Sequence, residues 1–245
     1  MGVRTGPARW SAWAAVLAIG TLMALNSGCG TPASDDSGSS GSPSPSVSPS
    51  VDGAASMTAP PSVDTSSMVI DHRHTDLADV PLEWIEAAKD TLHIAYGHTS
   101  HGSQIVTGMT GLTTFANAPH GGATYAWNDG GTGGALDLAD APFSGAYDLG
   151  NPNFSAWATA TRKYLDAPAN ADVNVVVWSW CGEVSRATPA NITTYLDLMS
   201  GLERDYPNVR FVYMTGHADG SGLTGNLHVR NQQIRDYCEA NGKIL

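Results

Sequence analysis

The stretch VNVVVWSW, residues 173–180, is the strongest strand candidate in the chain. Its run of valines is apolar enough to be buried on both faces, as strands of a parallel sheet are. A helix pattern follows it closely, because Thr188 and Pro189 form an N-cap with proline in the first turn. A buried strand followed by a helix is the repeating unit of an α/β protein.

The same alternation extends in both directions from residues 173–180. Further strands are expected at residues 92–96, 124–127 and 209–215, and further helices from Pro81, near Gln104, near Trp157 and through Ile234 to Asn241. Such alternation predicts right-handed crossovers, and therefore a three-layer α/β/α sandwich with a mainly parallel, flavodoxin-like sheet. Residues 243–245 look like the first residues of a fifth strand, so we expect the domain to be truncated at its C-terminal end.

The first 28 residues have the pattern of a lipoprotein-type signal peptide. Arg4 and Arg9 precede the apolar run 10–25, which is shorter than the roughly 20 residues of a membrane span. The run ends in small residues before Cys29, which we expect to be the lipidation site. The sequence therefore predicts an exported protein that touches the membrane only through a lipid anchor.

Residues 29–67 are rich in Ser and Pro and lack the apolar side chains needed to fold, which predicts a disordered tether. This leaves residues 68–245 as a single domain. A net charge of −11 with only 14% charged residues argues against nucleic-acid partners and against a basic lipid-binding patch. Three cysteines without paired CxxC motifs give no sign of a structural zinc module.

Polar, glycine-rich loops follow the expected strands. In open parallel sheets, ligands bind beyond the carboxyl ends of the strands, so these loops are where chemistry is expected. They combine glycines with hydroxyl, imidazole, amide and carboxylate groups, and they comprise Gly97–Gln104, Asn128–Gly131, Cys181–Ser185 and Gly216–Gly220. We predict that all four loops meet at one edge of the sheet.

Ser100 is the best nucleophile candidate in the first loop. It lies at a strand-to-helix turn, where free N–H groups at the helix start are aimed at a developing oxyanion. Ser103 is the alternative, although it sits closer to the helix start and can be its N-cap. The G-x-S-x-G elbow of α/β-hydrolases is absent, because His98 lies two residues before Ser100.

The stretches IAYGHTSHGSQ (94–104) and IRDYC (234–238) resemble a group of uncharacterised secreted bacterial proteins related to the SGNH (GDSL-type) hydrolases. The resemblance implies that Ser100 is the nucleophile and that its backbone N–H is one oxyanion donor. It also implies a second donor from a glycine, for which the chain offers three candidates: Gly102, Gly130 and Gly131.

The chain departs from the SGNH pattern at two places. His98 and Thr99 stand where GDSL enzymes carry Gly-Asp. Residues 181–183, Cys-Gly-Glu, stand where the family has Gly-x-Asn-Asp, so Gly182 and Glu183 are the site candidates there. Asn128 on the neighbouring loop could replace the missing Asn donor.

The SGNH pattern also requires a histidine base, in an Asp-x-x-His segment that would lie beyond Leu245. Within the chain the local candidates are His98, His101 and His217. His217 is favoured because it also follows a strand and has Asp219 nearby. The resemblance thus predicts a covalent serine mechanism that needs no metal or cofactor.

Two rival interpretations remain open. Zinc could be held where His98 and His101 converge with the segment His72–Asp76, which would make a metal-dependent hydrolase. Alternatively, a glycan-binding lipoprotein without catalysis could use tryptophans for stacking, with Trp180, beside the site, as the best placed.

Cys181 and Cys238 could also form a disulfide in the exported state. We expect an SGNH-like esterase, acting on a small-molecule or polysaccharide ester such as acylated extracellular carbohydrate.

Overall fold

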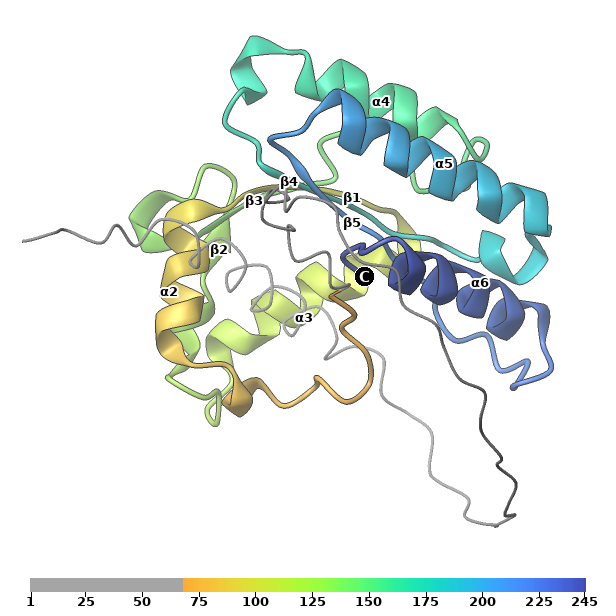
Figure 1. The fold of residues 1–245 in the computed structure, drawn as a ribbon. Helices are drawn as coiled ribbons and strands as arrows, with labels where there is room; N and C mark the ends of the chain where they lie inside the picture. The colour runs from red at the N-terminus through yellow and green to blue at the C-terminus, as the bar shows by residue number, and fades with distance from the viewer. Residues whose placement is uncertain (1–67) are drawn as a thin grey trace, which may run out of the picture. The chain divides into compact units, whose positions relative to one another are not determined.

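The computed structural model describes residues 68–245, which form an α/β fold around a five-stranded, all-parallel sheet (Figure 1). The predicted signal peptide, the lipidation site Cys29 and the tether lie outside the described residues. The sheet order is β2-β3-β1-β4-β5. Its strands are β1 (His93–Gly97), β2 (Trp127–Asn128), β3 (Leu136–Asp140), β4 (Val175–Trp178) and β5 (Arg210–Val212).

The central strand β1 fixes the register of the sheet. Tyr96 pairs with Asp140 of β3 on one side and with Val177 of β4 on the other. Beyond β5, Ile244 forms a parallel bridge to Val212, so the segment expected to begin a fifth strand does align with the sheet. This arrangement is compatible with a flavodoxin-like fold.

Among the described residues, five α-helices connect and cover the strands: α2 (Leu82–Thr91), α3 (Ser103–Thr114), α4 (Ala156–Leu165), α5 (Pro189–Asp205) and α6 (Asn226–Ala240). The expected N-cap of α5 is present, since the Thr188 hydroxyl accepts from the Asn191 amide in a reciprocal capping box. None of the helices in the described part of the chain is long and apolar enough to cross a membrane.

Alternate residues of the central strands enter two separate cores. Ile94 and Val177 pack in one core with apolar side chains of α2 and α3. Ala95 and Trp178 pack in the other core with side chains of α4, α5 and α6. Because successive strand residues point to opposite faces, helices are needed on both sides of the sheet, and the ribbon shows them there (Figure 1).

One strand of the sheet is not among those expected from the sequence. Residues 122–125 form a 3-10 helix, and β2 covers only two residues after it. The neighbour of β1 is instead β3, whose sequence LDLAD places acidic residues within a short strand. The two aspartates of this strand interrupt the apolar pattern that identifies the other strands. Without β3, the sequence pattern places the loop Asn128–Gly131 at the wrong edge of the sheet.

Candidate functional site

The carboxyl ends of β1, β3, β4 and β5 lie at one edge of the sheet, because all strands are parallel. The segments that follow them are 98–102, 141–155, 179–188 and 213–225, and we call this set the carboxyl rim. Three of the four predicted loops belong to it. The fourth, Asn128–Gly131, does not.

Ser100 sits at the start of a 3-10 turn, Ser100–Gly102, between β1 and α3. Its φ is +44°, in the left-handed region that non-glycine residues seldom adopt, and it is exposed. Such a conformation costs of order 1–3 kcal/mol and is enriched at functional sites; His120 and Ala141 also adopt it. The turn therefore holds the Ser100 side chain at the protein surface, on the carboxyl rim, in a conformation that its own backbone preference opposes.

Ser103 has a structural role in the same turn. Its hydroxyl donates a hydrogen bond of 2.6 Å to the Ser100 carbonyl. The N-cap of α3 is Gly102, so the expectation that Ser103 caps this helix is wrong. With its hydroxyl engaged, Ser103 is the weaker of the two nucleophile candidates.

His98 forms the closest acid–base pair on the rim. Its Nε2 lies 2.5 Å from Oδ1 of Asp140, at the end of β3, and its ring stacks on Tyr96 with centroids 4.5 Å apart. The side chain is only 7% exposed, and its Nδ1 is buried with no hydrogen-bond partner among the described residues. Sequence reasoning missed Asp140, because it missed β3.

Both backbone polar groups of Gly102 are hydrogen-bonded within the protein, so neither is available to a substrate. Its N–H donates to the Thr99 carbonyl, and its own carbonyl accepts from the Tyr96 hydroxyl. A Cβ at this position would lie 2.2 Å from Ser179 Oγ and 2.5 Å from His98 Cβ. The glycine is thus needed for close packing, and the expectation that its amide is an oxyanion donor is wrong.

Two histidines and a thiol meet where the segments after β1, β4 and β5 come together. His101 Nδ1 lies 3.5 Å from the Sγ of Cys181, and the His101 ring stacks on His217 with centroids 3.7 Å apart. Cys181 and Cys238 are both free thiols, so the possible disulfide is not formed. The Nε2 of His217 is buried without a partner among residues 68–245.

The predicted pair of His217 and Asp219 is not formed. The Nδ1 of His217 contacts the carbonyl of Ala218, while the Asp219 carboxylate accepts from Ser185 Oγ at 2.6 Å and from the Ser221 amide. These hydrogen bonds lower the pKa of Asp219 to about 2. Asp219 therefore braces its own loop and does not orient a histidine.

Beside Cys181 lie two carboxylates that sequence reasoning did not combine, Asp148 and Glu183. One ligand atom from each of these three residues lies within 4.8 Å of the others. Asp148 is fully buried, and its Oδ1 accepts from the Gly150 amide at 2.8 Å. Burial raises the pKa of Asp148, and the nearby Glu183 contributes in the same direction. Nothing in the sequence around Asp148 distinguishes it from a surface aspartate.

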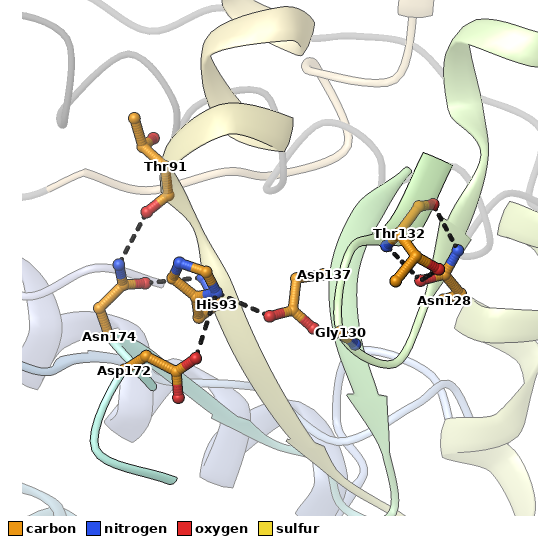
Figure 2. Close-up of polar contacts among 8 residues, drawn as sticks. All are labelled: Thr91, His93, Asn128, Gly130, Thr132, Asp137, Asp172 and Asn174. Atoms are coloured by element: carbon orange, nitrogen blue, oxygen red, sulfur yellow. Dashed lines mark hydrogen bonds and ion pairs between the residues drawn. The ribbon is translucent and has the colours of Figure 1, made fainter. Parts of the chain in front are cut away.

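The glycine turn with Asn128, Gly130 and Gly131 lies at the other end of the strands, the amino edge. The Gly130 amide donates to Asp137, whose carboxylate also bonds His93 at the start of β1 (Figure 2). The two ends of β1 are about 13 Å apart at about 3.3 Å per residue. The prediction that this turn joins Ser100 at one edge is wrong, because β2 pairs with the first residues of β3 rather than extending to the rim.

Asn128 also has a local structural role. Its side chain bonds the backbone of Thr132 twice, as donor and as acceptor, and so closes the turn (Figure 2). It therefore cannot replace the missing Asn donor of the SGNH pattern.

Trp180 is part of the core. It is 2% exposed, its Nε1 donates to the Met214 carbonyl, and its ring packs edge-on against Tyr195. It cannot stack against a substrate, so the expectation of a contact there is wrong. Trp157 and Trp178 are fully buried as well, so neither can stack against a glycan.

The histidines of the other rival interpretation do not converge. His74 contacts Asp71, and His72 and Asp76 are exposed. Residues 68–245 contain two groups of potential metal ligands: His93, Asp137 and Asp172, and Asp148, Cys181 and Glu183. Neither group includes a residue of the segment His72–Asp76, His98 or His101.

Comparisons with protein-family models, with curated proteins and with solved structures find no match to this chain.

Proposed function

We propose that the protein is an exported serine hydrolase of SGNH type that cleaves esters, with Ser100 as the nucleophile. The observation that carries this proposal is the left-handed φ of +44° at Ser100, on a turn between the central strand and a helix. Strain of this kind at an exposed hydroxyl is retained where the surrounding structure uses it, as in the nucleophile turns of other α/β hydrolases.

We propose His98 as the general base, in place of His217, because its ring is held by the Asp140 carboxylate. In the proposed mechanism His98 Nε2 donates to the Asp140 carboxylate, which leaves the lone pair on Nδ1 to accept a proton. A base oriented by a carboxylate is the arrangement that activates a serine. In the proposed step the Ser100 oxygen bonds the ester carbon, its proton passes to His98, and that proton then leaves with the departing alcohol.

Hydrolysis of the acyl-enzyme completes the cycle. Water loses a proton to the same imidazole and attacks the acyl carbon, and the Ser100 oxygen recovers its proton as the acid leaves. The backbone N–H of Ser100 is one candidate oxyanion donor. Gly182 is the second candidate, because it follows β4, the strand that pairs with β1 beside the Ser100 turn.

The proposed location rests on the leader and tether, and the proposed substrate class rests on that location together with the SGNH resemblance. A signal-like leader, Cys29 and a Ser/Pro-rich tether support export with a lipid anchor, which leaves acyl groups on extracellular carbohydrate as the proposed substrates. We further propose that helices on both faces complete a three-layer α/β/α sandwich.

Steady-state hydrolysis of p-nitrophenyl acetate and of acetylated xylan tests the proposal. Ser100→Ala should lower kcat by about 10⁴ or more, as loss of a serine nucleophile does. Ser103→Ala, the matched control on the same turn, should lose less than tenfold. Undiminished activity of Ser100→Ala, or no turnover of any ester by the wild-type chain, would refute the assignment.

A further inference from the structure

We propose that Asp148, Cys181 and Glu183 form a binding site for one divalent transition-metal ion, with zinc as the best fit. One ligand atom from each residue lies within 4.8 Å of the other two. This inference does not rest on the serine mechanism, in which none of the three residues takes part.

The first argument is an uncompensated buried carboxylate. Asp148 has no solvent exposure, and while its Oδ1 is bonded to the Gly150 amide, its Oδ2 has no partner within the described chain. An isolated buried charge costs many kcal/mol, so such groups are paired, protonated or bound to metals. Asp148 therefore needs a counter-ion or a proton.

The second argument is that Glu183, beside Asp148, also has an unpaired carboxylate oxygen. Its Oε2 is buried without a hydrogen-bond partner in residues 68–245. The ion pairs of Arg73, Lys89, Arg162 and Lys243 involve other carboxylates. Asp148 and Glu183 thus each bring a buried carboxylate oxygen without a hydrogen-bond partner in the described residues to the Cys181 thiol.

The backbone is built to bring these groups together. The Leu149 amide donates to the Ser179 carbonyl, which joins the loop carrying Asp148 to the segment carrying Cys181. A Cβ on Gly150 would lie 2.4 Å from Glu183 Cγ and 2.6 Å from Glu183 Cβ. Only glycine at position 150 leaves room for the Glu183 side chain to lie beside Asp148 and Cys181.

The donor set selects the class of ion. A thiolate favours zinc and other soft or borderline ions over calcium and magnesium, and zinc also accepts carboxylate oxygens. Ligand atoms of tetrahedral zinc lie about 3.3–3.5 Å apart, so the three groups, now within 4.8 Å of one another, need to approach by about 1.5 Å at most. Three protein ligands would leave a fourth position open.

His101 completes the arrangement as an outer-shell partner. Its Nδ1, 3.5 Å from the Cys181 Sγ, can donate a hydrogen bond to the thiolate, and stacking on His217 fixes the ring. Such partners orient metal ligands and raise their affinity. The contact between His101 and Cys181 thereby receives a role that the serine mechanism does not give it.

Zinc titration of the full chain by calorimetry, with elemental analysis of the dialysed complex, tests the proposal. We expect one zinc per chain, and Co²⁺ in its place should show thiolate-to-cobalt absorption. Asp148→Asn, Cys181→Ser and Glu183→Gln should each weaken binding by more than the roughly 10- to 100-fold typical of outer-shell partners. Asp137→Asn and Cys238→Ala are matched controls away from the cluster, and both should bind as the wild type does. Circular dichroism of each variant verifies folding.

Three results would overturn the proposal: no zinc bound by the folded wild-type chain, full affinity in a folded Cys181→Ser variant, or loss of binding in Asp137→Asn. The Ser100→Ala variant separates the two proposals. It should bind zinc normally even where its esterase activity is lost, and zinc binding by an inactive wild-type chain would refute only the hydrolase assignment.

Discussion

Strands β1 and β3 carry a histidine–aspartate pair at each end, and the two pairs differ in their surroundings. At the amino edge, His93 bonds Asp137 at 2.7 Å, and Asp137 also accepts from the Gly130 amide (Figure 2). At the carboxyl rim, His98 bonds Asp140 at 2.5 Å, but its Nδ1 is buried and unpaired. The first pair is a satisfied structural link, whereas the second retains an unused basic nitrogen.

The same contrast holds for the two groups of potential metal ligands. His93, Asp137 and Asp172 lie at the amino edge, where the His93 side chain is 39% exposed and the Asp172 side chain 66%. The group at the rim contains a fully buried carboxylate with an unpaired oxygen. Similar residue types at the two ends of one sheet are therefore distinguished by burial and by hydrogen-bond satisfaction, not by composition.

The largest expected effect comes from exchanging one carboxylate in each pair for an amide. Asp140→Asn should lower kcat for ester hydrolysis by up to about 10⁴, the loss seen when the carboxylate that orients a catalytic histidine becomes an amide. Asp137→Asn should change kcat less than threefold, because its histidine lies at the other end of β1. Parallel steady-state kinetics of the two variants check this, and equal losses would remove the functional difference between the two edges.

A second expectation concerns the thiols. Burial raises the pKa of Cys238 to about 12, so at pH 8 its thiolate fraction is about 10⁻⁴, roughly 10³ below that of an unperturbed thiol. In a Cys29→Ser background, Ellman's reagent at pH 8 should modify the half-buried Cys181 first and Cys238 only on unfolding. Raising the pH toward 12 should speed the reaction at Cys238, and zinc should protect Cys181. Rapid modification of Cys238 at pH 8 would contradict the assigned burial.

Glycines at the two edges should respond differently to alanine. Gly102→Ala places a Cβ against Ser179 and His98, and should lower the free energy of unfolding by about 1–3 kcal/mol, as overpacking does. Gly130 has free space around it, so Gly130→Ala should cost only the roughly 1–2 kcal/mol of a left-handed φ and leave hydrolysis unchanged. Urea unfolding monitored by tryptophan fluorescence measures both. Wild-type activity in Gly102→Ala would argue that its packing against His98 does not position the base.

The smallest effect is expected at Asp219. Its pKa of about 2 lies below the ordinary value, so its hydrogen bonds stabilise the fold above about pH 4, and this contribution is lost as the pH falls through about 2. Ser185→Ala should raise this pKa toward its ordinary value, which an NMR pH titration would detect. If His217→Ala instead shifted the Asp219 pKa, this result would contradict the structure, in which His217 and Asp219 do not pair.

The sequence predicts the fold better than it predicts the site, for identifiable reasons. The valine run in β4 and the capping box of α5 are local signals, so their predictions required no tertiary information. The acidic strand β3 gives no such signal, and its omission hid Asp140 and misplaced the turn at Gly130. Ser100 is found because its loop is chemically unusual. Asp148 is not, because its burial arises from chain packing that no local pattern records.

Labelling of the full chain with a fluorophosphonate, followed by mass-spectrometric mapping, tests most directly whether the carboxyl rim holds a reactive serine. We expect one modified peptide, with the adduct on Ser100, and no labelling of Ser100→Ala. An unlabelled wild-type chain, or an adduct that persists in Ser100→Ala, would contradict the assignment of Ser100 as the nucleophile.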